Sequence, residues 1–186
     1  MLCGEKVLLR ARQDSDIPVL EAELYGDVLT RSRGDSRPWR PLPPGSADSP
    51  YRVTNWRSDP AVFSVVELAS EELAGDALLW GVDDHNRFAH LGISVLPSFR
   101  GRGLGTDITR VLCRYGFETR GLQRLQVDTL ADNEAMIRAA ARAGFTREAQ
   151  LRRAAWVNGS FVDVVLLGQL AAEWFGDGPA WAGDPG

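Results

Sequence analysis

Three glycines and two arginines stand together in the segment SFRGRGLGTDITRVL, residues 98–112. Glycine lets the backbone approach a bulky group closely and adopt conformations that other residues avoid. The apolar residues that follow have helical spacing, and the N-terminus of a helix presents unpaired N–H groups and the positive end of the helix dipole. A glycine turn that leads directly into a helix therefore indicates a site for an anion such as a phosphate.

The spacing of the glycines excludes two common phosphate-binding loops. The loop of nucleotide hydrolases requires G-x-x-x-x-G-K-[ST], but Gly105 is followed by Thr106 and there is no lysine. The dinucleotide fingerprint requires G-x-G-x-x-G, whereas Gly101, Gly103 and Gly105 form G-x-G-x-G. The pattern that remains is R-x-x-G-x-G, which begins at Arg100.

The elements before this turn are short strands and one helix. Ile17, Leu20 and Leu24 recur with helical spacing and predict a helix from Asp14 to Leu24. Apolar runs bounded by turn residues predict four strands, at residues 7–11, 63–68, 76–82 and 88–96. The glycine turn thus follows directly after a predicted strand.

The elements after the turn complete a βαβ unit. Ile108, Val111 and Tyr115 follow the helical period, and Gly121 ends that helix. The next strand, at residues 122–130, is expected to run parallel to the strand before the turn. Open α/β sheets bind ligands beyond the carboxyl ends of their strands, which is where the glycine turn lies.

Two further elements are predicted toward the C-terminus. A second helix spans about residues 133–143, and the Asn-Gly pair in VNGSF predicts a tight hairpin turn between two strands. Residues 30–49 are rich in Pro, Arg, Ser and Gly, and we expect them to form one long loop. The C-terminal tail, residues 174–186, has no predicted element.

The composition is that of one globular domain, residues 1–186. The chain is 44% hydrophobic and has no stretch near the roughly 18 apolar residues that a membrane span needs. The N-terminus lacks the pattern of a signal peptide. Cys3 and Cys113 are too few for a disulfide framework and have no metal-ligand spacing, so we expect a cytoplasmic protein without a metal and a buried thiol at Cys113. The net charge of −4 argues against a general nucleic-acid binder, although 20 of the 21 basic residues are arginine.

On these motifs the chain resembles the GNAT superfamily of acyl-CoA-dependent N-acetyltransferases, whose pyrophosphate-binding signature is R-x-x-G-x-G. The segment RFAHLGISVLPSFRGRGLG resembles the strand and loop of that signature, and DNEAMIRAAARAGF resembles N-x-x-A-I-x-x-Y-E-K-x-G-F. GEKVLLRARQDSDIPVL and LRRAAWVNGSFVDVVLLGQL are similar to the branch that acetylates the N-termini of ribosomal proteins. The resemblance covers about residues 4–170 and implies an α/β fold with a mixed, mostly antiparallel sheet flanked by helices.

The resemblance also implies acetyl-CoA as the cosubstrate. The pyrophosphate would bind the backbone of the glycine turn, with Arg100 or Arg102 adding charge. The expected cofactor-binding residues of the turn are Arg100, Gly101, Arg102, Gly103, Leu104, Gly105 and Thr106. The backbone of the preceding strand would pair with the pantetheine arm at Ile93, Ser94 and Val95. Asn133 would reach the same arm, and it is also a suitable cap for its own helix.

Acetyl transfer needs a neutral amine, and because an alkyl ammonium has a pKa of about 10, a base or a water relay must remove its proton. In relatives, a carboxylate five residues before the motif asparagine can do this, and Asp128 holds that position. His90 is the other candidate, where the resembled branch often carries glutamate. Strand alternation places each opposite an apolar face. A solvated aspartate and a hydrogen-bonded histidine are the structural alternatives.

One departure from the family leaves the function more open. Where many relatives carry a tyrosine that protonates the leaving thiolate, this chain has Ala140, and Met136 replaces the serine of other members. The similarity favours a protein N-terminal α-amine as acceptor, whereas the loop at residues 30–49 favours a small amine such as an antibiotic or a polyamine. A CoA-binding regulatory module without turnover is a third alternative. The sequence leaves open whether the protein forms a homodimer, and no nucleic-acid or membrane partner is expected.

Overall fold

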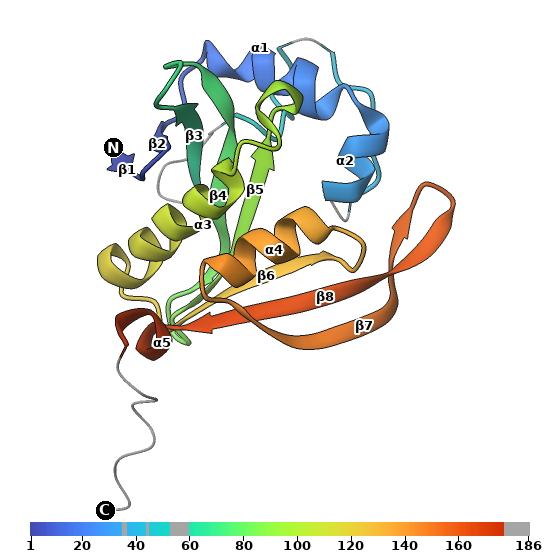
Figure 1. The fold of residues 1–186 in the computed structure, drawn as a ribbon. Coiled ribbons are helices and arrows are strands. Elements are labelled where there is room, and N and C mark those ends of the chain that lie inside the picture. Colours follow the sequence, from blue (N-terminus) through green and yellow to red (C-terminus); the bar gives the residue numbers. More distant parts are fainter. Residues whose placement is uncertain (35–36, 44, 53–59, 177–186) are drawn as a thin grey trace, which may run out of the picture.

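The computed structural model describes residues 1–34, 37–43, 45–52 and 60–176. Its strands form one eight-stranded sheet with helices packed on both faces (Figure 1). The strand order is β1-β2-β3-β4-β5-β6-β8-β7. The strands are β1 (Leu2–Cys3), β2 (Val7–Ala11), β3 (Ala61–Glu67), β4 (Leu73–Asp83), β5 (Phe88–Val95), β6 (Arg124–Leu130), β7 (Thr146–Val157) and β8 (Ser160–Leu170).

All neighbouring strands are antiparallel except β5 and β6, which are parallel. They are connected by α3 (Leu104–Arg114) and a π-helical turn, η3 (Tyr115–Thr119). This is the βαβ unit that the glycine turn and the alternating strand predict. The expected α/β fold with a mixed, mostly antiparallel sheet is confirmed.

The strands β7 and β8 form a long hairpin that extends to one side of the molecule (Figure 1). Its turn lies at Asn158 and Gly159, which both have positive φ angles, of 48° and 91°. Asparagine and glycine are the residues that tolerate this conformation at a hairpin turn. The hairpin predicted from VNGSF is confirmed.

One face of the sheet packs against α3 and α4 (Glu134–Arg142). The side chains at this interface are fully or almost fully buried, among them Leu79, Ile108, Leu112, Leu125 and Val127. Cys113 of α3 is also buried, as expected, and burial raises the pKa of its thiol far above the usual range. The alternation predicted for β6 is confirmed, because its apolar side chains lie on this face.

Asp107, in the first turn of α3, connects the helix to the N-terminal segment. Its buried carboxylate accepts hydrogen bonds from the backbone N–H groups of Glu5, Lys6 and Val7, at 3.1, 2.7 and 3.0 Å. These residues are about a hundred positions apart in the chain. A negative charge is favourable at a helix N-terminus, so Asp107 stabilises α3 while it holds the start of β2.

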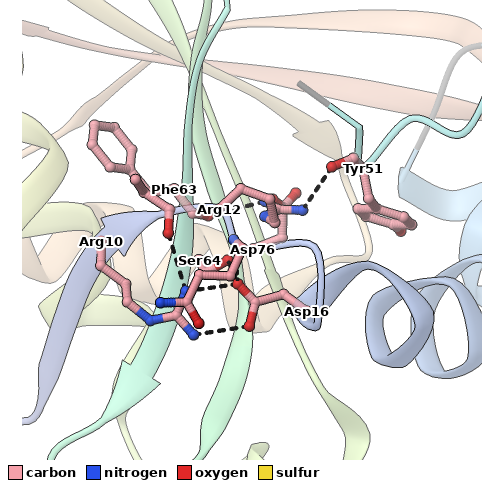
Figure 2. Close-up of polar contacts among 9 residues, drawn as sticks. Arg10, Arg12, Asp16, Tyr51, Phe63, Ser64 and Asp76 are labelled. Atoms are coloured by element: carbon pink, nitrogen blue, oxygen red, sulfur yellow. Dashed lines mark hydrogen bonds and ion pairs between the residues drawn. The ribbon is translucent and has the colours of Figure 1, made fainter. Parts of the chain in front are cut away.

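The opposite face of the sheet carries two ion pairs beneath α1 (Asp16–Leu20), shown in Figure 2. Arg10 and Asp16 form a bidentate pair with distances of 2.7 and 2.8 Å, and the Ser64 hydroxyl donates to the same carboxylate at 2.7 Å. Arg12, whose side chain is 3% exposed, pairs with the buried Asp76. The two pairs connect β2 and α1 with β3 and β4.

The region between α1 and β3 differs in one respect from the sequence prediction. The predicted helix at residues 14–24 is present as α1 and the π-helical segment η1 (Glu21–Tyr25). The prediction of a single loop that begins at residue 30 is wrong, because the helix α2 (Val28–Gly34) occupies the beginning of that segment. Asp27 starts this helix by accepting hydrogen bonds from the backbone N–H groups of Leu29 and Thr30. Residues 35–36 and 44 of the predicted loop lie outside the described residues.

The chain end also differs from the prediction. The helix α5 (Ala171–Phe175) covers the beginning of the segment expected to be a tail. Trp174 donates a hydrogen bond to Glu118 at 3.0 Å and packs against Phe117. Residues 177–186 lie outside the described part of the chain. Within the described part, the helices are all too short or too polar to cross a membrane.

Candidate functional site

The glycine turn lies between the carboxyl end of β5 and the N-terminus of α3, after one 3₁₀ turn, η2 (Pro97–Phe99). Gly101 and Gly103 have φ angles of +79° and +80°, a conformation that residues with a side chain rarely adopt. Gly103 is the N-cap of α3 and provides no side-chain cap. Because the first N–H groups of a helix lack acceptors within the helix, those that follow Gly103 are available for an anion.

Three cations surround this turn, and they lie differently from the sequence expectation. The Arg102 guanidinium pairs with Glu67 at 2.8 Å, so its charge is directed toward the end of β3. The Arg100 side chain donates from Nε to the Val95 carbonyl at 3.1 Å. Lys6 lies directly at the turn, where its Nζ donates to the Arg102 carbonyl at 3.1 Å. It lies 3.2 Å from the position that a Cβ on Gly103 would take.

The strands β5 and β6 pair only over three residue pairs, the last of which is His90 and Gln126. On its other side, β5 remains paired with β4 as far as Val95. Among the described residues, the β6-facing edge of β5 therefore has no strand partner beyond His90. Ile93, Ser94 and Val95 lie on this open stretch, where an extended arm can add like a further strand.

Helix α4 closes this region from the apolar side. A Cβ on Gly105 would lie 3.6 Å from both Ala139 of α4 and Ile93 of β5, so α3 packs closely against its neighbours. Asn133 caps α4, because its Oδ1 accepts from the Met136 N–H at 3.3 Å. Its Nδ2 donates to the Thr129 hydroxyl at 3.0 Å. The capping interpretation of Asn133 is confirmed, and its contact with the cofactor stays a prediction.

The two candidate bases lie side by side on the face opposite α3. The Nδ1 atom of His90 is 2.9 Å from Oδ2 of Asp128, and the two side chains are 19% and 30% exposed. Burial alone would raise the pKa of Asp128, but the hydrogen bond from Gln126 and the nearby side chains of His90 and Arg124 together lower it. Nδ1 of His90 is buried and lies close to the carboxylate without being aligned for a hydrogen bond. Asp128 is therefore an anion at neutral pH. The sequence offers the two residues as alternatives, and the structure brings them into contact.

Aromatic side chains hold the imidazole of His90. The Trp80 ring stacks on it at a centroid distance of 4.2 Å and an angle of 16°, and Phe88 contacts it edge-on at 4.7 Å. A Cβ on Gly81 would lie 3.1 Å from Cδ2 of His90, so this edge of the ring lies against the β4 backbone. The buried nitrogen is Nδ1, so the 19% exposure belongs to other atoms of the side chain.

A row of polar side chains continues from Asp128 along β6. Gln126 donates from Nε2 to Oδ1 of Asp128 at 2.6 Å, and its Oε1 accepts from Arg124 at 3.2 Å. Arg124 in turn pairs with Glu148 of β7, with a distance of 2.8 Å between Nη1 and Oε1. We call these residues, with His90, the β6 polar row.

The helix α2 lies over the carboxyl ends of β5 and β6. Arg33, in its last turn, forms an exposed ion pair with Asp132 of the β6–α4 connection at 2.6 Å. At its other end, hydrogen bonds from Thr30 and a smaller contribution of the Arg100 charge lower the pKa of Asp27. The first part of the Pro- and Arg-rich segment is thus placed beside the open edge of β5.

Sequence reasoning missed Lys6, Trp80 and the members of the β6 polar row beyond His90 and Asp128, which are Gln126, Arg124 and Glu148. Lys6 and Trp80 reach the site through contacts between distant strands, which no local pattern signals. The alternation of Arg124, Gln126 and Asp128 in β6 is such a signal, because it places all three on one face. Within the described residues, no group of three His, Cys, Asp or Glu side chains is arranged to hold a metal ion.

A helix N-terminus that offers N–H groups to an anion, next to an open strand edge, suits a pyrophosphate joined to an extended pantetheine arm. Such a site is compatible with an acyl-CoA-dependent transferase. The family comparison agrees, since the acetyltransferase (GNAT) domain matches residues 6–146. The chain belongs to the GNAT acetyltransferase family. It is an acyltransferase that uses acetyl-CoA.

Individual relatives carry two different names. The chain is 34% identical over 140 residues to the putative ribosomal N-acetyltransferase YdaF of Bacillus subtilis, covering 72% of this chain and 76% of the relative. It is 29% identical over 103 residues to the spermidine N(1)-acetyltransferase of Escherichia coli, covering 55% of each. The spermidine N-acetyltransferase from Vibrio cholerae, solved in complex with CoA and spermine, has the same fold, with a TM-score of 0.79 at 20% identity over 91% of this chain and 98% of that one.

Proposed function

We propose that this enzyme transfers the acetyl group of acetyl-CoA to the N-terminal α-amine of a protein. The observation that carries the acceptor class is the pairing of carboxylates on the face of the sheet that holds His90. Asp16 is paired with Arg10, Asp76 with Arg12, and at the α2 end Asp132 is paired with Arg33. Recognition of a polyamine, which carries several positive charges, would need further carboxylates, besides Asp128, that are not already neutralised by arginine.

The similarity to YdaF supports the same acceptor, because at 34% identity it covers 72% of this chain, against 55% at 29% identity for the spermidine N(1)-acetyltransferase of Escherichia coli.

We assign cofactor binding to the glycine turn and the open edge of β5. The N–H groups at the start of α3 would bind the pyrophosphate, and Lys6 would add a positive charge beside them. The backbone of Ile93, Ser94 and Val95 would hold the pantetheine arm. Acetyl-CoA supplies the acetyl group as a thioester, whose C–S bond breaks as the new C–N bond forms.

We assign the base to the pair formed by His90 and Asp128. The Asp128 carboxylate, 2.9 Å from Nδ1 of His90, would favour a proton on that nitrogen. Nε2 would then hold the lone pair that takes the proton of the acceptor ammonium, directly or through water. The lowered pKa of Asp128 makes it a weak base by itself and a good partner for an imidazolium.

The leaving thiolate would take its proton from water or from the nitrogen that has attacked the thioester, which must lose a second proton to become the amide. Ala140 is fully buried in α4, so this position provides no acid. The proton that His90 removes from the amine is then returned to solvent. No step in this scheme needs a group that the chain lacks.

The test of the acceptor is release of free thiol from acetyl-CoA with a panel of N-terminal peptides, spermidine and small amines. We expect turnover with peptides and little with spermidine. A higher kcat/KM for spermidine would overturn the acceptor class and leave the acetyltransferase activity intact.

A variant of the glycine turn tests the cofactor site. Gly103→Glu places a side chain at a left-handed φ and a carboxylate where the pyrophosphate would bind, so CoA binding in calorimetry is expected to be lost. Gly159→Glu, at the distal hairpin turn with φ of +91°, is the matched control for the backbone strain. Unchanged CoA affinity in Gly103→Glu would contradict the assignment.

The single domain over residues 1–186, the cytoplasmic location and the homodimer stay predictions. A sedimentation measurement on the full chain tests the last of them.

A further inference from the structure

The β6 polar row ends at His90 but begins at the outer part of the sheet, where Glu148 of β7 pairs with Arg124. Each hydrogen bond of the row has a fixed donor and a fixed acceptor. Arginine can only donate, so the Gln126 oxygen must face Arg124, and the Gln126 amide nitrogen must face Asp128. The amide of Gln126 is therefore fixed by its two neighbours.

The orientation of Gln126 also determines how Asp128 is used. One carboxylate oxygen accepts from Gln126 at 2.6 Å, and the other lies 2.9 Å from Nδ1 of His90. A proton on Nδ1 would face this carboxylate, which is an anion. The remaining groups against the imidazole are Trp80 and Gly81 of β4 and Phe88 of β5, none of which titrates.

A glycine on β8 makes room for this arrangement. Gly168 is the register partner of Gln126. A Cβ at this position would lie 2.7 Å from an Arg124 guanidinium nitrogen and 2.5 Å from the Glu148 carboxylate. The strand β8 thus has a glycine where the row needs space for an ion pair on its surface.

We infer that Gln126, held in place by Arg124, is a positioning residue that fixes Asp128 and through it the tautomer of His90. This rests on the proposed function, in which Nε2 of His90 is the base. Gln126 itself does not touch the reacting atoms. Its contribution is to keep one acceptor oxygen of Asp128 directed at Nδ1, so that Nε2 keeps its lone pair.

The experiment removes the hydrogen bond between Gln126 and Asp128 and leaves His90 and Asp128 in place. Gln126→Leu keeps the size of the side chain but cannot donate to Asp128, and Arg138→Gln is the matched control, because it breaks an exposed Arg138–Glu134 pair of 2.6 Å far from the row. The chain has two histidines. A His85→Asn background therefore leaves His90 as the single imidazole for ¹⁵N NMR.

In the parent protein we expect the His90 signals of an Nδ1–H tautomer. In Gln126→Leu we expect mixed tautomers and a kcat about tenfold lower, the effect of one lost hydrogen bond to a charged group, with the KM for acetyl-CoA unchanged. Gly168→Ala is expected to change the tautomer in the same direction by a smaller amount. Arg138→Gln is expected to change neither.

A second variant keeps the inference testable where Gln126→Leu does not fold. Gln126→Glu still accepts from Arg124 but adds a carboxylate next to Asp128, and the negative charge should move the acidic limb of the pH–kcat profile to higher pH. An unchanged His90 tautomer in Gln126→Leu, or an unchanged limb in Gln126→Glu, would overturn the inference. If His90→Gln keeps the parent rate and profile, the proposed base is wrong, while the NMR result still decides the role of Gln126.

Discussion

Two groups of charged side chains lie on the same face of the sheet, and they differ in what surrounds them. Arg12, Asp16 and Asp76 are buried beneath α1, and Arg10 is partly exposed, and each guanidinium forms an ion pair with a carboxylate (Figure 2). The β6 polar row is half-exposed, and its last member is an imidazole instead of an arginine. A guanidinium does not give up its proton in a protein, whereas a neutral imidazole has one ring nitrogen that can accept a proton. The first group is thus suited to stabilise the fold and the second to move a proton.

The largest expected effect comes from breaking the buried group. Arg12→Met leaves Asp76 buried without its guanidinium, and loss of one partner of a buried pair costs about 3–5 kcal/mol. Urea unfolding should show this loss in the free energy of unfolding. The double variant Arg12→Met with Asp76→Leu should recover most of it, because no charge is then left unpaired. Equal destabilisation of the single and double variants would contradict this.

The second effect should appear in rate and not in stability. Asp128→Asn removes the carboxylate that faces Nδ1 of His90, so kcat is expected to fall by roughly 10²-fold, the scale of a lost general base. Its half-exposed position predicts a free energy of unfolding within about 1 kcal/mol of the parent. Thiol-release assays and thermal unfolding measure the two quantities. A large loss in the free energy of unfolding with an unchanged kcat would mean that Asp128 stabilises the fold and does not take part in proton transfer.

The smallest effect is a pH dependence of stability that sets Asp16 against Asp76. Although burial opposes it, hydrogen bonds from Arg10, Ser64 and the Gln13 backbone lower the pKa of Asp16 to about 2. Because the folded pKa lies below the unfolded one, this stability is present above about pH 4 and is lost as pH falls toward 2. It is on the order of 2 kcal/mol. Asp16→Asn should remove this slope in acid unfolding curves, and an unchanged slope would contradict the pairing.

Asp76 should contribute a slope of the opposite sign. Burial raises its pKa, and the charge of Arg12 and the hydrogen bond from it oppose this. A folded pKa above the unfolded one means that stability falls as pH rises through the folded value. Acid unfolding curves of Asp76→Asn and Asp16→Asn should therefore change the pH dependence of the free energy of unfolding in opposite directions.

The sequence predicts those parts of the molecule that depend on neighbours along the chain. The glycine turn, the Asn158–Gly159 hairpin and the alternation of β6 each follow from local backbone preference or period. The sequence pattern does not predict the helix α2, although Asp27 is a suitable N-cap, because the prolines and glycines that follow indicate a loop.

The candidate site shows the limit of the same reasoning. Strand alternation gives the face on which His90 and Asp128 lie, but their contact depends on the parallel register of β5 and β6. The two strands are separated along the chain by the glycine turn and α3, so no local pattern gives that register. The pairing of Arg12 with Asp76, 64 residues apart, likewise has no local signal.

The hydrogen bonds of Asp107 to the backbone of residues 5–7 bear on how the chain reaches its fold during synthesis. The start of β2 leaves the ribosome long before Asp107, and its partner strand β3 also comes later, at residues 61–67. About a hundred further residues must therefore be synthesised after the start of β2 before all of its partners exist. Contacts of such long range slow folding, so the N-terminal strand is expected to dock late on the nascent chain.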